Sequence, residues 1–557
     1  MAGQQQYYEE PADQQYAGQA QPVGSTGEDL TALASVPWVA IALALHVILL
    51  VIAYFIYPPA QERTQMQVIQ SQVEQEAIPP TPEQPPEEPT EFPKDEPVQE
   101  NPTEDERIVE DAKDDNNEDP SDKPNNDLAE NPNNDPSKDE SPHPNKNSTT
   151  SAVGLGGGVG GGGGRGGAGG FAFRRARGGG GRKFDDRTKA ALEWLKDHQN
   201  REGHWSSTGF SDDTTRTSAQ KTYNIDFVRP GDKDGDKGWE QTCDIGLTGM
   251  SLLAFVGAGY DHKEGDYKTT CRQAILYLRK VQSNDGCFGP KEDDHFIYNH
   301  AISAMAMAEA YGLSGDAVLK PIADKAVEFI LQAQNPGLGW RYGVRPTYND
   351  SSVTGWMVLA LKSCKMAGLE FDYHKVYDDA AKWYDMVTVD MNGYPKTGYD
   401  SPGNNNARLR SAKDEYDNNP SMDSIYVMSM LFMGKADLTD AKIKSQSRVC
   451  VEKDYLPRWE LKKIDYYFWY YASLALYQVG GSTWDTWEKA MSKTLLESQR
   501  GYHEKDKAKG LTTKDSLDEH GSWDSVDAWG SAGGRVYSTA INCLTLEVYY
   551  RYQKLHK

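Results

Sequence analysis

Several polar residues stand directly before strongly apolar segments in the C-terminal two-thirds of the chain. They are Asp244, Asn299, Asp350, Ser421, Asp465 and Ser538. If the apolar segments are parallel helices, their amino ends gather at one mouth of a barrel, and a ring of polar groups around an apolar cavity is typical of a substrate site. Asp, Asn and Ser are also preferred N-caps. The sequence alone leaves both interpretations open.

Two of these carboxyls, Asp244 and Asp350, are the candidates for acid catalysis, because an isolated carboxylic acid at an apolar cavity can protonate a substrate. The other four residues, together with His300, are candidate binding residues. A zinc site on Cys243, Asp244 and His300 is an alternative, since thiolate, carboxylate and imidazole all bind this metal. A core cysteine and a hydrogen-bonded histidine explain the same residues, and we predict neither a metal site nor a cofactor.

A glutamine, a glycine and an aromatic residue recur between an amphipathic segment and the apolar segment that follows it. The clearest copies are Gln199 with Gly203 and Trp205, Gln282 with Gly286 and Phe288, and Gln334 with Gly339 and Trp340. Glycine just past a helix end lets the chain turn, and the glutamine amide is expected to bond the carbonyls at that helix end. This repetition predicts helix pairs that bury their apolar faces against one another.

Six such pairs fit between residues 183 and 557. The first helices are expected near Asp186, Tyr267, Ala317, Lys375, Asp440 and Thr483. The second helices begin near the six polar residues above and are the more apolar members. Because a helix that is apolar nearly all round is a buried one, this alternation predicts an inner and an outer ring. The fold class is therefore all-α, an α6/α6 toroid, with longer connections over 206–239 and 501–520.

The Gln…Gly-x-aromatic turns resemble the repeats of squalene and terpene cyclases. The six-pair plan is similar to the α/α toroid of those enzymes and of protein prenyltransferases. Residues 183–557 resemble the prenyltransferase/squalene oxidase repeat proteins of bacteria. The resemblance implies a cavity for an apolar or peptide ligand, or an enzyme that acts on an isoprenoid. Since the chain lacks the Asp-x-Asp-Asp motif of the cyclases, we favour a ligand-binding or scaffold protein.

The amino-terminal third divides by composition into a polar head (1–35), an apolar run (36–57), an acidic Pro-rich linker (58–150) and a Gly/Arg-rich hinge (151–182). The linker holds 25 Asp and Glu residues but 7 Lys and Arg residues, so it carries most of the formal net charge of −24. Such a segment cannot bury enough apolar surface to offset its ordering entropy, and we expect it to be disordered and extended. We read the hinge as a flexible spacer and expect no nucleic-acid partner.

The apolar run predicts a retained single-pass transmembrane helix, because about 22 residues cross a hydrocarbon core of about 30 Å. With His46 inside it and a Pro/Glu linker after it, the run resembles the anchor of TonB-type energy transducers. That resemblance implies the bacterial inner membrane, an extracytoplasmic toroid and ExbB/ExbD-type motor proteins as partners. A serine one turn before the histidine completes the motif in that family, whereas this chain has Ala42.

Overall fold

The computed structural model describes residues 182–551, except 224, 228–235, 239–240, 293–294 and 405–416. The predicted head, apolar run and linker lie outside the described residues. Within the described ranges, no helix is both long enough and apolar enough to cross a membrane. The described residues belong to the predicted toroid, whose first helix begins at Arg182.

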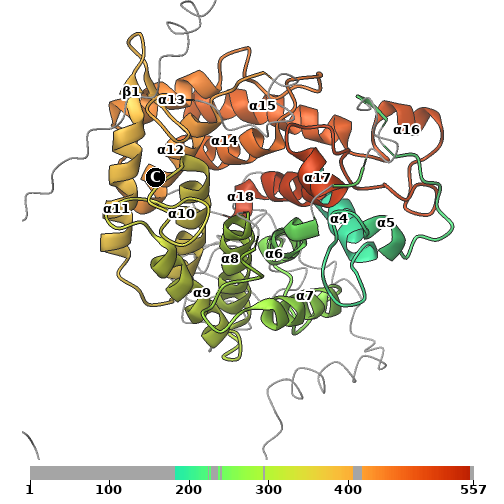
Figure 1. The fold of residues 1–557 in the computed structure, drawn as a ribbon. Helices are drawn as coiled ribbons and strands as arrows, with labels where there is room; N and C mark the ends of the chain where they lie inside the picture. The colour runs from blue at the N-terminus through green and yellow to red at the C-terminus, as the bar shows by residue number, and fades with distance from the viewer. Residues whose placement is uncertain are drawn as a thin grey trace, which may run out of the picture. The chain divides into compact units, whose positions relative to one another are not determined.

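An inner ring of six helices lies at the centre of the described domain. These helices are α6 (Asp244–Gly257), α8 (Phe296–Ser314), α10 (Ser351–Met366), α12 (Ser421–Met433), α14 (Tyr466–Val479) and α17 (Gly530–Leu546). Each helix packs against the next in this order, and α17 packs against α6, so the ring closes (Figure 1). Every residue of α12 is buried, as expected of a helix that is apolar on all sides.

An outer ring of six amphipathic helices surrounds the inner one in the same part of the chain. These helices are α4 (Arg182–Asp197), α7 (Lys268–Val281), α9 (Lys320–Ala333), α11 (Tyr373–Val387), α13 (Ala441–Cys450) and α15 (Gly481–Ser498). The last five each pack on the inner helix that precedes them, and α4 packs on α17. The domain is therefore an all-α, α/α toroid of six helix pairs, as the alternating segments predict.

Short elements occupy the connections between these helices. They are α5 (Phe210–Asp213), the 3-10 turn η3 (Gln241–Cys243), β1 (Thr388–Asp390), β2 (Pro395–Thr397), α16 (Glu504–Ala508) and α18 (Val548–Arg551). β1 and β2 form an antiparallel hairpin in which Val389 lies opposite Lys396. This hairpin replaces the glutamine turn in the fourth pair, where the sequence has no glutamine before the glycine.

The glutamine of each turn links two neighbouring helix pairs. Nε2 of Gln282 donates to the Gly286 carbonyl of its own turn (3.1 Å) and to a carbonyl in the first turn of α9 (3.0 Å). The amides of Gln199, Gln334 and Gln499 do the same and reach α7, α11 and α4. The amides were expected to bond the carbonyls at their own helix end; they bond a carbonyl of their turn and one of the next outer helix instead. Because Gln499 contacts α4, this link also joins the last pair to the first.

Two of the turn glycines show why a side chain is excluded there. Gly286 has a φ of 90° and Gly521 a φ of 92°, a conformation that disfavours residues with a Cβ. A Cβ on Gly286 would also lie 2.1 Å from the Lys325 carbonyl oxygen of α9, and one on Gly521 would lie 2.1 Å from that of Ala190 in α4. The glycines thus let each turn approach the backbone of the next outer helix.

The sixth pair departs from its predicted boundary. α17 begins at Gly530, not near Ser538, and has a non-helical residue at Gly534 (φ 64°, ψ −158°). The sequence did not indicate this helix start, because 530–534 is rich in glycine and has no apolar periodicity.

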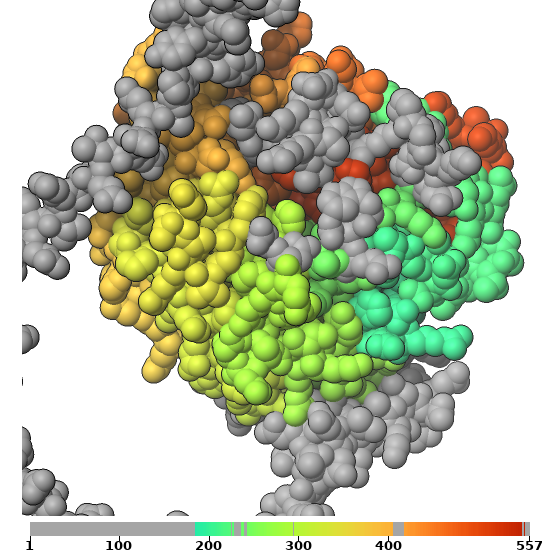
Figure 2. All heavy atoms as spheres, in the orientation of Figure 1, coloured from blue at the N-terminus to red at the C-terminus, as the bar shows by residue number. Residues whose placement is uncertain are grey.

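The two long connections contact each other through a bridge between Gln220 and Leu517. In the space-filling view, the red surface of the last pair lies beside the green surface of the first (Figure 2).

Candidate functional site

The amino ends of the inner helices lie together, as the contacts between them show. Asn299 near the start of α8 donates to a carbonyl just before α6 (2.6 Å). Tyr298 of α8 donates to Ser352 at the start of α10 (3.0 Å). Asn419, before α12, donates to Asp465, before α14 (2.7 Å). The inner helices are therefore parallel, and their polar amino ends form one mouth of the toroid.

Asp350 at this mouth combines complete burial with an unpaired carboxyl oxygen. As the N-cap of α10 it accepts from the Val353 N–H through Oδ1 (2.7 Å). Its Oδ2 has no hydrogen-bond partner among the described residues, and Nε of Arg341 lies 3.9 Å away. Burial raises the pKa of Asp350 to about 7; Arg341 opposes this rise and Asp400 adds to it. Near neutral pH the carboxyl can therefore both donate and accept a hydrogen bond.

Tyrosine side chains surround this carboxyl. The hydroxyls of Tyr342 and Tyr399 lie 2.5 Å apart, and the Arg341 guanidinium lies 5.5 Å and 5.8 Å from the two ring centres. Tyr298 and Tyr342 are partly exposed. Burial, with a contribution from the charge of Asp350, raises the pKa of Tyr298 and of Tyr399. These tyrosines remain protonated and offer both hydroxyl groups and ring faces.

Side chains of α10 and α14 meet inside the ring, beneath the mouth. The hydroxyls of Ser352 in α10 and Tyr467 in α14 lie 2.7 Å apart, although α12 packs between these helices in the ring. The Trp356 ring of α10 lies 5.9 Å from the ring of Tyr470 and 5.4 Å from that of Tyr471, both in α14. These side chains therefore fill space between the two helices on the inner side of α12.

Asp244, the second candidate acid, lies in a different environment. It is the first residue of α6, and its Oδ1 accepts from the Ser207 N–H (2.7 Å). Burial raises its pKa, and the Ser207 amide opposes the rise. Asn299 binds the same helix end from α8, because its Oδ1 accepts from the Gly246 N–H (3.1 Å). Asp244 and Asn299 therefore hold this part of the mouth together, and Asn299 caps its neighbour instead of its own helix.

His300 occupies a position that threonine fills in other pairs. There the backbone N–H of the aromatic turn residue donates to a hydroxyl of the inner helix, namely that of Thr248, Thr354 or Thr539. In the second pair the Phe288 N–H donates to Nδ1 of His300 (3.2 Å), and Nε2 donates to the Ala326 carbonyl (3.1 Å). Burial lowers the pKa of His300 to about 3. Both ring nitrogens are occupied, so His300 has no free atom for zinc or for a ligand.

The remaining candidate residues make local structural contacts. Asp465 caps α14 and accepts from a backbone N–H of its first turn (3.0 Å). Ser421 is the first residue of α12, after Pro420, and its side chain does not cap the helix. Ser538 lies inside α17, where its hydroxyl donates to the Gly534 carbonyl (3.3 Å). The prediction that Ser421 and Ser538 are N-caps is therefore wrong.

Metal-ligand clusters are absent from the part of the chain that the structure describes, where no group of three or more His, Cys, Asp or Glu side chains could hold an ion. All six cysteines lie in this part, and none of them forms a disulfide there. The described residues therefore do not bring Cys243, Asp244 and His300 together as the alternative zinc site. Hydrogen-bonding and aromatic groups make up the candidate site instead.

Five residues near Asp350 were not predicted from the sequence. These are Tyr298, Arg341, Tyr342, Tyr399 and Tyr467. Arg341 and Tyr342 directly follow the Gly339-Trp340 turn, and Tyr298 directly precedes Asn299. Their positions next to a predicted turn or helix start are the sequence feature that could have indicated them.

The fold and the site define an α/α-toroid protein with a polar, tyrosine-lined mouth. No protein-family model and no curated protein matches the chain. Among solved structures it is similar to an α-amylase from Clostridium perfringens, with 11% identity and a TM-score of 0.42 over 66% of this chain and 98% of that one.

Two further solved structures are similar to the chain. One is an inactive variant of an α-1,6-mannanase of Salegentibacter sp. in complex with α-1,6-mannotriose, with 13% identity and a TM-score of 0.42 over 66% of this chain and 99% of that one. The other is a protein from Actinoplanes, with 15% identity and a TM-score of 0.33 over 66% and 99%. Likeness at this level says nothing about activity.

Proposed function

We propose that the toroid is a ligand-binding domain that holds a hydroxyl-bearing ligand, such as a glycan, at the mouth beside Asp350. Support comes from the buried Oδ2 of Asp350, which lacks a hydrogen-bond partner among the described residues. Leaving a buried polar atom unpaired costs on the order of 1–3 kcal/mol, so a ligand that pairs with it recovers that free energy. The partly exposed rings of Tyr298 and Tyr342 provide surfaces against which a sugar ring can pack.

The groups at the mouth have separate roles in this proposal. Asp350, with a pKa of about 7, donates to or accepts from a ligand hydroxyl. Arg341 lies between Asp350 and Asp400, 3.5 Å from an oxygen of Asp400, and its planar guanidinium provides several donors in fixed directions. A site built around such groups discriminates against ligands that lack the matching hydroxyl.

Calorimetric titration of the full-length protein with a panel of soluble glycans, peptides and isoprenoid alcohols tests the ligand class. We expect a glycan to bind, and Asp350→Asn and Tyr298→Phe to weaken binding about tenfold or more. Tyr311→Phe, on the same helix α8 but near its other end, is the control and should bind like the wild-type protein. If only peptides or apolar compounds bind, the proposed ligand class is wrong. If Asp350→Asn binds the glycan as tightly as the wild-type protein, the proposed site is wrong.

An enzyme that acts on an isoprenoid is the second candidate function, because the same carboxyl also suits that chemistry. Protonation of an alkene needs a protonated carboxylic acid, and aromatic rings stabilise the resulting cation. Asp350 is partly protonated near pH 7 and lies near tyrosine rings. Product analysis after incubation with squalene or a prenyl diphosphate tests this function. Turnover that Asp350→Asn abolishes and Asp244→Asn retains would establish it at this acid; absence of product would leave the binding function.

We also propose that the toroid is anchored to a bacterial inner membrane and lies outside the cytoplasm. Support comes from the apolar run 36–57 and the long acidic linker 58–150, which suit a membrane anchor and a tether. Fractionation of cells, followed by protease treatment of intact spheroplasts, tests the topology. A toroid that is released without detergent, or that stays protected from protease, would contradict it.

ExbB/ExbD-type motor proteins are the proposed partners of this anchor. An ionisable residue within a membrane segment is a functional candidate, and His46 is such a residue in 36–57. Co-purification with these proteins should be lost in His46→Ala and retained in His143→Ala, which changes a histidine of the linker. Co-purification that survives His46→Ala would show that this histidine has no specific role.

A further inference from the structure

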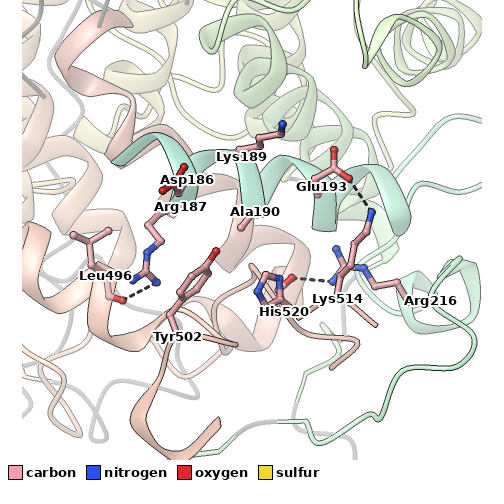
Figure 3. A pocket seen from close by; sticks show the side chains of 10 residues that line it. All are labelled: Asp186, Arg187, Lys189, Ala190, Glu193, Arg216, Leu496, Tyr502, Lys514 and His520. Carbon is pink, nitrogen blue, oxygen red and sulfur yellow. Dashed lines mark hydrogen bonds and ion pairs between the residues drawn. The ribbon is translucent and has the colours of Figure 1, made fainter. Parts of the chain in front are cut away.

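A pocket of about 780 Å³ opens on the outside of the ring, between the first and last helix pairs (Figure 3). Its walls come from α4, the end of α15 and the connection 501–520, and Arg216 of the other long connection also lines it. A volume of this size is typical of small-molecule sites. The pocket is separate from the Asp350 mouth and shares none of its residues.

Arg216 is a buried cation in the wall of this pocket. The residue is only 7% exposed, and its Nε donates to Asp197 (2.8 Å). Its Nη1 donates to the backbone carbonyls of Asp518 (2.9 Å) and His520 (2.8 Å). Its buried Nη2 has no hydrogen-bond partner among the described residues. The guanidinium is therefore held rigidly by three contacts while one donor nitrogen remains unpaired.

A second guanidinium faces the same space. The Arg187 group lies 3.4 Å from the centre of the Tyr502 ring, and its Nη1 donates weakly to the Leu496 carbonyl (3.4 Å). Figure 3 shows Arg187 and Tyr502 on one side of the pocket and Arg216 on the other, with His520 between them. Both guanidinium groups thus line one pocket, and guanidinium groups bind anionic oxygens through charge-assisted hydrogen bonds.

The acidic side chains that line the pocket do not pair with the two arginines, although Arg216 forms an ion pair with Asp197 (2.8 Å), which does not line the pocket. Glu193 is engaged elsewhere, because its Oε1 accepts from the Tyr267 hydroxyl (2.6 Å) and its Oε2 from Lys514 (3.3 Å). Asp186 is exposed, where solvent screens its charge. Burial, assisted by the charge of Arg216, lowers the pKa of His520 to about 4, so its ring is neutral at pH 7. Two carboxylates and four cationic side chains thus line the pocket, so the lining carries a net positive charge; the cations are Arg187, Lys189, Arg216 and Lys514.

We propose that this pocket binds an oxyanion, the phosphate or carboxylate group of a small ligand, between Arg216 and Arg187. Charge-assisted hydrogen bonds from guanidinium groups are strong and geometrically specific. The Tyr502 ring gives the rest of the ligand an aromatic surface. Because Gln499 also links this region to the Arg187 carbonyl (2.9 Å), the bound anion contacts both ends of the helix ring and stabilises its closure.

Calorimetric titration of the full-length protein with inorganic phosphate, sulfate and citrate tests the site. Phosphate and sulfate are tetrahedral anions and citrate is a carboxylate, so comparing the three titrations shows which class of anion binds. We expect saturable binding of at least one anion. Arg216→Gln and Arg187→Gln should each weaken it about tenfold or more. The melting temperature of the wild-type protein should rise with anion concentration, because the anion binds the folded state.

Arg448→Gln, which removes an exposed arginine of α13, is the matched control and should bind like the wild-type protein. If Arg216→Gln fails to fold, Arg187→Gln alone tests the proposal. We expect Arg187→Gln to fold, because Arg187 makes fewer contacts than Arg216. The proposal is overturned if none of the three anions binds saturably to the wild-type protein. It is also overturned if Arg187→Gln binds as tightly as Arg448→Gln.

Discussion

At the scale of single residues, Asp350 and Asp465 have the same local role and different surroundings. Each caps an inner helix by accepting from a backbone N–H of the first turn. The second oxygen of Asp465 accepts from Asn419 (2.7 Å), whereas that of Asp350 has no hydrogen-bond partner in the described ranges. Capping and the Asn419 contact therefore engage both oxygens of Asp465, whereas capping engages only Oδ1 of Asp350.

The stability of the protein should depend on pH through Asp350. Burial raises the pKa of this carboxyl from 3.8 to about 7, so between these values the folded state holds a proton that the unfolded chain has released. The free energy of unfolding therefore falls as pH rises from about 4 to about 7, by up to about 4 kcal/mol. Asp350→Asn keeps a capping side chain and cannot ionise. Denaturant unfolding should show that the stability of Asp350→Asn relative to the wild-type protein increases as pH rises across this range. If the free energies of unfolding of the two proteins change with pH in parallel, the prediction is wrong.

His300 should be replaceable by threonine more easily than by alanine. His300→Ala removes a buried ring and leaves the Phe288 N–H and the Ala326 carbonyl unpaired, which should lower the free energy of unfolding by about 2–4 kcal/mol. His300→Thr should cost less, because a threonine hydroxyl accepts the equivalent N–H in other pairs. Urea denaturation measures both values. Equal losses would show that the shared hydrogen bond contributes little.

At the scale of elements, the repeated turn is a joint between neighbouring pairs. Its glutamine reaches the next outer helix and its aromatic ring covers the turn, and its glycine adopts a positive φ at Gly203, Gly286 and Gly521 but not at Gly339. The Trp340 indole, for example, donates to the Ile330 carbonyl at the end of α9 (2.8 Å). The motif is therefore a signature of how pairs assemble, which is why it predicts the fold better than the function.

Gln334 allows a direct test of this joint. Its Nε2 donates to the carbonyls of Leu338 (2.8 Å) and Val376 (3.2 Å). Gln334→Ala should lower the free energy of unfolding by about 1–3 kcal/mol. Gln334→Glu should lower it further, because a carboxylate has no donor and would face two carbonyl oxygens. Gln332→Glu, at an exposed position of the same helix, should change it by less than about 0.5 kcal/mol. If Gln334→Glu and Gln332→Glu change the free energy of unfolding equally, the Gln334 side chain does not stabilise the contact between the two helix pairs.

At the scale of the whole toroid, contacts at several places close the ring, and two of them join helices directly. On the outside, Gln499 joins the sixth pair to α4. At the carboxyl ends of the inner helices, the buried Arg551 donates to Glu309 of α8 (2.8 Å) and to the Leu253 carbonyl of α6 (3.1 Å). Burial raises the pKa of Glu309, and Arg551 opposes that rise. The end of the chain thus ties the last inner helix to the first two.

Loss of Arg551 should destabilise the whole domain. Arg551→Met leaves Glu309 buried without its cationic partner and should lower the free energy of unfolding by about 3–5 kcal/mol. The double variant Glu309→Gln/Arg551→Met removes the Glu309–Arg551 pair, leaves the buried Glu547 that lies 3.8 Å from Arg551, and should lose less than Arg551→Met alone. Denaturant unfolding of both variants checks this order. A double variant that is the less stable of the two would show that the ion pair is not the main contact.

Most helix starts could be predicted from the sequence, because apolar periodicity, capping residues and turn glycines act over a few residues. The prediction failed where the local pattern is weak. The start of α17 lies in the glycine-rich stretch 530–534, and the hairpin of the fourth pair replaces a turn that the sequence only suggests. The candidate site was half predicted: Asp350 was named, whereas Arg341 and the tyrosines around it were not.

The sequence by itself determined that the described domain consists of paired helices arranged in two rings, because helix formation and burial follow from local pattern. Only the tertiary structure decided which polar groups are satisfied. Asp465 and His300 find their partners on other elements, and Asp350 retains an oxygen without one among the described residues. Tyr467 meets Ser352, although α12 packs between their two helices. Such contacts join residues far apart in the chain, and no local pattern specifies them.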